Sequence, residues 1–138
     1  MAVRIAMTEV SLIRVYALRA LYLTMAIGEG SIQWPLLFHH VPWSMMSGVA
    51  HAMLAALAAV SLLGVRYPLK MLPLLFYELA WKVVWLTVVA LPLWRAGPLD
   101  AGMMETVVAC LLVVIVPVIV PWPYIVANYM RAPGDRWR

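Results

Sequence analysis

The sequence has little charge and a single cysteine. Asp, Glu, Lys and Arg make up 12% of its 138 residues, whereas 66% are hydrophobic, and this charged share is about half that of a typical soluble domain. A soluble chain of this length could not bury so much apolar surface. Because Cys110 is alone, an intrachain disulfide and CxxC redox chemistry are excluded, and we expect it to serve in packing. GxSxG, HExxH and glycine-rich phosphate-binding motifs are also absent.

Four long apolar stretches account for most of the chain. Each has about 20–25 residues, enough for a helix to cross a hydrocarbon core of about 30 Å. Pro35 and Pro42 are expected to bracket the first turn between them. We therefore predict an all-α fold, a four-transmembrane-helix bundle that forms a single membrane domain over residues 1–138. The predicted spans are residues 15–38, 45–65, 71–94 and 103–127.

Positive charge gathers on one side of this predicted bundle. The first turn has no Lys or Arg, and the third has only Arg95. The positive-inside rule therefore predicts that both termini and the second turn are cytoplasmic. The first apolar run continues past Glu29, so we expect a retained helix and not a cleaved signal peptide. We expect no nucleic-acid partner, because the basic residues form no patch with interleaved aromatics. These basic residues are Arg4, Arg14, Arg19, Arg66, Lys70, Arg131, Arg136 and Arg138.

Four ionisable side chains lie inside the apolar stretches: Glu29, His51, Glu78 and Lys82. Such a group near the bilayer centre costs about 2.5–3.5 kcal/mol on insertion scales, so it persists where it is paired, hydrated or functional. Glu29 and His51 fall at similar depths below the outer rim, and Glu78 and Lys82 share one face of the third helix. These positions predict an outward-facing polar cavity with the Glu78–Lys82 pair at its floor.

The candidate ligand-binding residues are therefore Glu29, His51, Glu78, Lys82, Trp81 and Trp85. Each also has a structural interpretation. Glu78 and Lys82 can form an ion pair that fixes helix register. Glu29 can be held neutral or paired, and His51 can be a hydrogen-bonded packing residue. The tryptophans can pack, or Trp81 can face Lys82 in a cation–π contact. A stripe of small residues in the second span favours close helix packing: Gly48, Ala52, Ala55, Ala56 and Ala59.

Imidazole and thioether groups near the first turn give a minor alternative, a periplasm-facing copper site. Soft ligands of this kind suit Cu(I), although ten methionines in an apolar chain make such clustering common. A b-type haem needs two facing imidazoles, and only His51 lies deep enough. We therefore expect no cofactor and no resident metal. The weak copper candidates are His39, His40, Met45 and Met46.

A resemblance enters at the second turn and the third span. Three parts of the chain resemble a family of uncharacterised bacterial four-helix inner-membrane proteins. They are residues 66–73, the set Glu78, Trp81, Lys82 and Trp85, and the tail 132–138. In size and topology the chain is also similar to the DoxX-like proteins. The resemblance implies a bacterial inner-membrane location and a four-helix topology. It implies no site, because that family has no assigned activity.

Two classes of function follow. In the first, the cavity binds or transports a small amphipathic or apolar molecule. In the second, the chain is an accessory or scaffold subunit of a membrane complex, with structural ion pairs. An enzyme is disfavoured, because no nucleophile–base pair can be identified. In either class we expect the lipid bilayer and further copies or a partner membrane protein as partners, contacted through the uncharged fourth helix.

Overall fold

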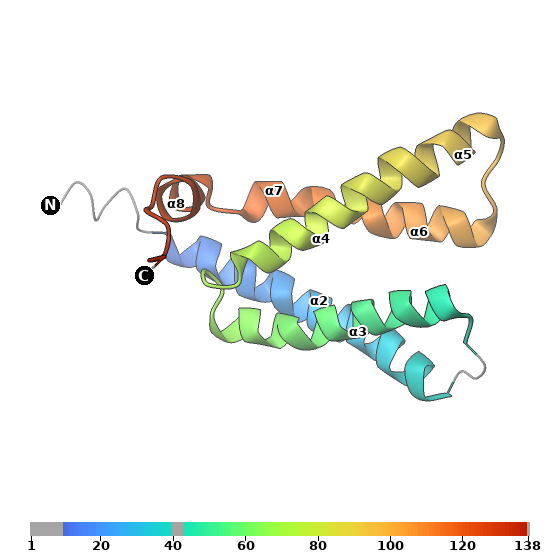
Figure 1. Ribbon diagram of the computed structural model, residues 1–138, viewed down its shortest axis with the longest axis horizontal. Helices are drawn as coiled ribbons and strands as arrows, with labels where there is room; N and C mark the ends of the chain where they lie inside the picture. Colours follow the sequence, from blue (N-terminus) through green and yellow to red (C-terminus); the bar gives the residue numbers. More distant parts are fainter. Residues whose placement is uncertain (1–9, 40–42, 138) are drawn as a thin grey trace, which may run out of the picture.

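The computed structural model describes residues 10–39 and 43–137, which are helical and contain no strand (Figure 1). The predicted all-α fold is confirmed for these residues. Four long rods follow one another: α2, α3, the continuous run from α4 to α5, and the run from α6 to α7. The helical segments are α2 (Leu12–His39), α3 (Met45–Arg66), α4 (Leu72–Trp85), η1 (Leu86–Ala90), α5 (Leu91–Ala96), α6 (Ala101–Leu111), η2 (Leu112–Val114), α7 (Ile115–Ile119), α8 (Trp122–Ile125) and η3 (Val126–Met130).

Three of the rods are long and apolar enough to cross a membrane: Met45–Arg66, Leu72–Ala96 and Ala101–Ile119. The predicted length and apolar character are confirmed for these three. The 28 residues of α2 also suffice in length, but polar residues such as Glu29 and Gln33 interrupt its apolar sequence. The fourth crossing stays a prediction.

Prolines determine where the later rods change or end. Pro92 has no N–H to donate, and the π-helical turn η1 directly precedes the short helix that contains it. Val120 is extended, with ψ 132°, because a residue before proline is disfavoured in the helical region. The fourth apolar stretch, predicted as one span over 103–127, is therefore divided: α7 ends at Ile119 and α8 starts at Trp122.

The ends of the helices at the first turn agree with the predicted spans, but Pro35 does not mark its start. We expected Pro35 and Pro42 to bracket it, but α2 continues through Pro35 to His39. Pro42 lies outside the described residues. After the turn, the Ser44 side chain accepts a hydrogen bond from the Ser47 N–H at 3.3 Å, which caps the N-terminus of α3.

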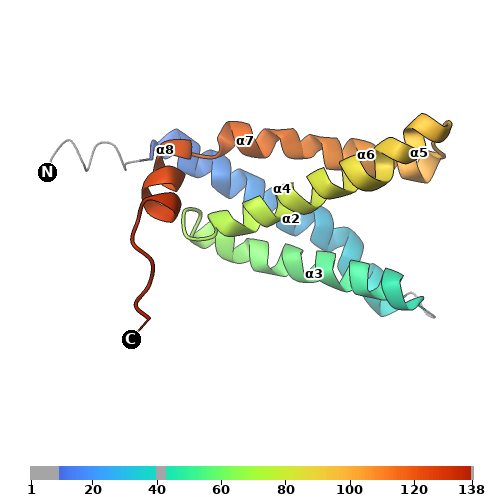
Figure 2. The same cartoon turned by 45° about the horizontal axis from the view of Figure 1, so that its top comes forward.

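The rods form two hairpins. One consists of α2 and α3, and the other of α4–α5 and α6–α7. The hairpins meet at the end that holds the start of α2, the segment α8–η3 and the α3–α4 turn, and they diverge toward the opposite end (Figures 1 and 2). We call the joined end the basic end, because it carries Arg14, Arg66, Lys70, Arg131 and Arg136.

The hydrophobic core lies at the basic end. Tyr22 of α2 is fully buried, its ring packs against Gly64 of α3, and its hydroxyl donates to the carbonyl of Pro68 at 3.0 Å. Side chains from α2, α4, the fourth rod and α8 meet around it, so both hairpins contribute to one core. The buried members of this core are Leu18, Tyr22, Leu72, Leu75, Val113, Val116, Val120 and Ile125.

The segment after the break closes the basic end. In Figure 1, α8 is seen along its axis while the long rods run across the view, so it lies crosswise to them. The Tyr129 hydroxyl donates to the Leu69 carbonyl at 2.9 Å in the α3–α4 turn. Partial burial raises the pKa of the Tyr129 phenol, which keeps it a donor. Arg14 of α2 donates to the carbonyls of Ile119 and Val120 at 3.2 and 2.9 Å, and so satisfies acceptors that the helix break leaves open.

The small-residue stripe of α3 differs from the predicted one. Of the predicted set, Ala55 is buried, but Ala52, Ala56 and Ala59 are exposed. The buried small residues are instead Ala55, Ala58, Ser61 and Gly64. They repeat at three-residue intervals. This face of α3 packs against α2 because Gly64, which has no side chain, leaves room for the Tyr22 ring. Ser61 satisfies its own hydroxyl by donating to the Leu57 carbonyl at 2.8 Å.

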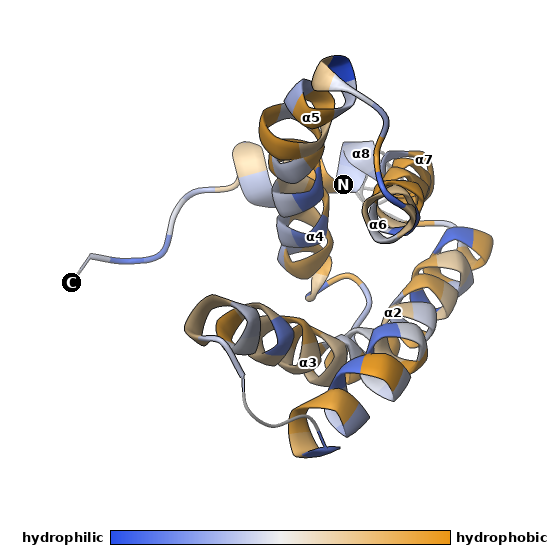
Figure 3. Cartoon of the chain, turned by 90° about the vertical axis from the view of Figure 1, so that its right-hand side faces the viewer, coloured by the Kyte–Doolittle hydropathy of each residue, from blue (hydrophilic) through white to orange (hydrophobic). Residues whose placement is uncertain are grey.

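Much apolar surface remains outside the core. In the most apolar windows of the three spanning rods, 28%, 17% and 17% of the residues are buried, so most of their side chains face outward. Figure 3 shows hydrophobic residues over much of the long rods, with hydrophilic residues between them on α2, α3 and α4. This distribution is that of helices surrounded by lipid or by other membrane helices.

Candidate functional site

The first polar cluster lies on α4. Glu78 is 3% exposed. Its Oε1 pairs with the Lys82 ammonium one turn later, and its Oε2 accepts a hydrogen bond from Trp81 Nε1 at 3.0 Å. The ammonium also lies 5.4 Å from the centre of the Trp81 ring, within the range of a cation–π contact. Both carboxylate oxygens of Glu78 are therefore engaged within a single helix.

The sequence indicated this ion pair but not the role of Trp81. The four-residue spacing predicts the pairing of Glu78 with Lys82, and it is present. The indole of Trp81 was expected to pack or to face the ammonium. It also donates to the carboxylate, which the three-residue spacing permits. Trp85 is half-buried at the end of α4, and among the described residues it takes no part in these polar contacts.

The second polar cluster joins α2 to α3. Gln33, which is 6% exposed, donates from Nε2 to Glu29 Oε2 at 3.3 Å. Its other amide atom, Oε1, lies 2.5 Å from His51 Nδ1. A carboxylate only accepts, so the amide nitrogen faces Glu29 and the amide oxygen faces His51. His51 therefore donates from Nδ1–H, and the ring also packs against Trp43 with 4.8 Å between centroids.

Gln33 is the site residue that sequence reasoning missed. The polar groups identified in the apolar stretches were ionisable side chains, and the Gln33 amide is not ionisable. The available signal was spacing, because Gln33 follows Glu29 by four residues and so shares its face of the helix. Glu29 and His51 do share one network, but only through this amide.

The carboxylates of the two clusters differ in their partners. Glu78 has a cation and an indole N–H, whereas Glu29 has one neutral amide donor. In the described part of the chain, no cation lies within ion-pair distance of Glu29, and its Oε1 accepts no hydrogen bond. Glu29 is also only partly buried. It therefore keeps acceptor capacity.

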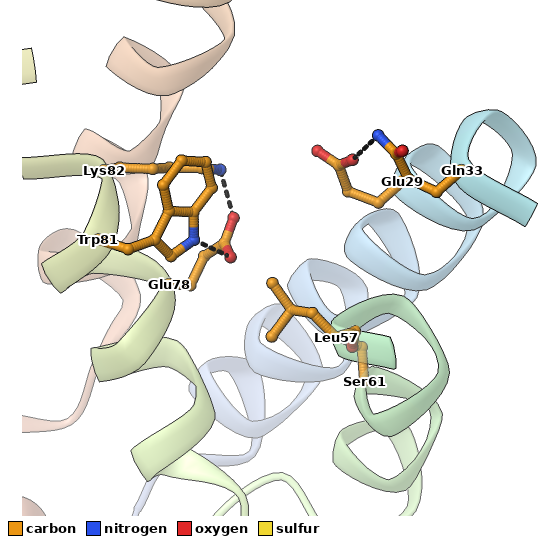
Figure 4. A network of polar contacts seen from close by, with 7 residues as sticks. All are labelled: Glu29, Gln33, Leu57, Ser61, Glu78, Trp81 and Lys82. Atoms are coloured by element: carbon orange, nitrogen blue, oxygen red, sulfur yellow. Dashed lines mark hydrogen bonds and ion pairs between the residues drawn. The ribbon is translucent and has the colours of Figure 1, made fainter. Parts of the chain in front are cut away.

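The two clusters face one another from opposite hairpins. In Figure 4, the Glu29 carboxylate points from α2 toward Glu78 and Lys82 on α4. Cys110 of α6 is buried and within electrostatic range of all three. Charged groups on α2 and α4 thus converge near the thiol of α6, inside an otherwise apolar assembly.

Apolar grooves lie beside these groups. One, of about 190 Å³, is between α3 and α4; Trp81 forms part of its wall together with Ala50, Met53, Leu54, Leu57 and Tyr77. A larger one, of about 390 Å³, is between the η1–α5 segment and α6 and is lined by apolar side chains such as Leu86 and Met104. We call the first the α3/α4 groove. Trp81 belongs both to the wall of this groove and to the first polar cluster, so the groove lies next to that cluster.

The weak copper candidates lie on either side of the α2–α3 turn. His39 is exposed at the end of α2, and Met45 and Met46 are exposed at the start of α3. His40 lies outside the described residues. Within the described ranges, no group of three or more His, Cys, Asp or Glu side chains is arranged to hold a metal ion.

Comparison of the chain with protein-family models, with curated proteins and with solved structures finds no match. The resemblance to bacterial four-helix inner-membrane proteins therefore stays a prediction.

Proposed function

We propose that the protein binds a small amphipathic molecule within the membrane, between its two hairpins. The observation that carries this proposal is the opposition of Glu29 on one hairpin to Glu78 and Lys82 on the other (Figure 4). Ionisable groups in an apolar interior are costly, and they commonly mark the path of a substrate or an ion. The α3/α4 groove offers space beside them for an apolar tail.

A purely structural role accounts for one cluster only. Glu78 has its partners within α4, so its charge is balanced without the second hairpin. The second cluster, formed by Glu29, Gln33 and His51, takes no part in that balance. No cation of the described residues pairs with its carboxylate. The Glu29 carboxylate, which points toward the opposite hairpin, is better explained by a molecule that is held there.

Membrane placement is part of the proposal. We take α2 as the fourth span, because its 28 residues give a helix about 42 Å long. The basic end faces the cytoplasm of a bacterial inner membrane, since Lys and Arg beside the spans are retained on that side. Both termini are then cytoplasmic, and the molecule enters from the outer side, where the hairpins diverge.

An accessory role is the second candidate, and the exposed fourth rod favours it. Val108, Leu112, Ile115 and Val118 are exposed on that rod, which suits contact with a partner helix or a second copy. Crosslinking in native membranes separates the candidates in part. A crosslinked dimer or complex that forms through this surface supports the accessory role. Recovery of monomer alone at every protein density argues against it.

The central experiment measures binding directly. The protein is placed in lipid nanodiscs, and calorimetry follows titration with decyl amphiphiles that carry cationic, neutral or anionic head groups. We expect saturable binding of at least one head-group class at a stoichiometry of one per chain. The proposal fails if no class binds beyond its partition into empty nanodiscs.

Substitutions in α3 locate the bound tail. Ala50→Trp fills the α3/α4 groove, and we expect it to weaken binding at least tenfold. Ala59→Trp places the same side chain at an exposed position of the same helix, so it serves as the matched control and should bind normally. Equal effects of the two changes would exclude this groove as the tail site.

A further inference from the structure

We infer that the molecule bound between the hairpins carries a positive charge, which pairs with the Glu29 carboxylate. This inference rests on the proposed function and adds the chemical class of the ligand. It follows from the balance of charge in the interior and from the kind of surface beside it.

Among the described residues, one interior carboxylate has no cationic partner. Lys82 is engaged by Glu78, so this pair is neutral overall. Gln33 is neutral, and the Nδ1–H of His51 is used by the Gln33 amide. The Glu29 carboxylate remains, with one amide donor and no cation among the described residues. An apolar environment penalises an unpaired charge, so an external cation beside Glu29 is favoured.

The surroundings favour an organic cation over a metal ion. In the described part of the chain, no group of three acidic, histidine or cysteine side chains is arranged to ligate a metal. The nearby α3/α4 groove has the aromatic walls of Tyr77 and Trp81. Aromatic faces attract ammonium groups, and the apolar remainder of the groove suits an alkyl chain. An amphiphile with an ammonium head and an alkyl tail matches both features.

The test uses three probes that share a decyl tail and differ in the charge of the head group. Decyltrimethylammonium, decyl maltoside and decyl sulfate are titrated into the protein in nanodiscs at neutral pH. We expect the cation to bind at least tenfold more tightly than the neutral probe.

Two isosteric variants assign the effect to Glu29. Glu29→Gln keeps side-chain size and should reduce the affinity for the cation to that for the neutral probe. Glu105→Gln removes an exposed carboxylate of α6 and should change neither affinity.

The outcomes separate the two proposals. Equal binding of all three probes to the unmodified protein overturns the charge assignment but leaves amphiphile binding in place. A cation preference that survives in Glu29→Gln overturns the role of Glu29. Absence of saturable binding by every probe overturns the proposed function, and this inference falls with it.

Discussion

The ring of Tyr22 occupies the space where Gly64 would carry a side chain. This contact brings α2 and α3 together at the basic end, and the Tyr22 hydroxyl extends it to the Pro68 carbonyl of the following turn. A glycine is needed here for close approach, since the residue lies in a regular helix and not in an unusual backbone conformation.

Gly64→Ala should therefore destabilise the protein. A methyl group at this position overlaps the Tyr22 ring, and overpacking of this kind costs about 1–3 kcal/mol. Thermal unfolding in detergent micelles measures the change. Gly28→Ala is the control, because a methyl group there meets nothing within 4 Å and should be neutral or stabilising. Equal melting temperatures for the two variants would contradict the close packing of Tyr22 on Gly64.

Loss of Lys82 should be more harmful than loss of the whole ion pair. Lys82→Met leaves the buried Glu78 without its cation, which typically costs about 3–5 kcal/mol. The double variant Glu78→Gln with Lys82→Met removes the stranded charge and should be milder. Unfolding free energies of the two single variants and the double variant test this coupling. Strict additivity would refute the pairing.

Arg14 should stabilise the break in the fourth rod. Arg14→Met removes two hydrogen bonds to the carbonyls of Ile119 and Val120. Because these bonds come from a charged donor, we expect a loss of about 1.5–3 kcal/mol and faster amide exchange in α8. Arg131→Met removes an exposed arginine of the tail and should have little effect. Unchanged exchange in α8 of the Arg14 variant would show that the break is held by other contacts.

The direction of the Gln33 hydrogen bonds predicts the tautomer of His51. Nitrogen NMR of labelled histidine should find the proton on Nδ1. In Gln33→Leu, the acceptor is lost and the Nδ1–H form should no longer dominate. Protonation at Nε2 in the unmodified protein would reverse the assignment of the amide and remove the connection between Glu29 and His51.

Orientation can be tested with single cysteines. In a Cys110→Ser background, Gly97→Cys should react with an impermeant thiol reagent in intact cells. Gly134→Cys should react only after the membrane is made permeable. The reverse pattern would place the basic end outside and overturn the proposed topology.

The sequence was informative where structure depends on neighbours along the chain. Apolar runs predicted the first three helical rods to within a few residues, whereas the fourth rod ends at Ile119, well before the predicted residue 127. The four-residue spacing predicted the Glu78–Lys82 pair. Contacts between distant segments were not accessible in this way. Arg14 was interpreted as a membrane-flanking charge, although it bonds to carbonyls more than a hundred residues away. The packed face of α3 was misassigned because the Tyr22 ring, and not the alanine count, selects it.

The segment α8–η3 closes the basic end, so the two ends of the molecule differ in how well the space between the hairpins is covered. Helices, a crosswise segment and a continuous core all meet there, whereas no described segment lies crosswise over the other end. For the ligand proposed above, the onward route past the basic end is blocked by the buried core. Release past that end would require the core to come apart, whereas release along the entry route would not. Under the proposed function, this conformation would retain and return a ligand on one side, and passage across the membrane would need a second arrangement of the same hairpins.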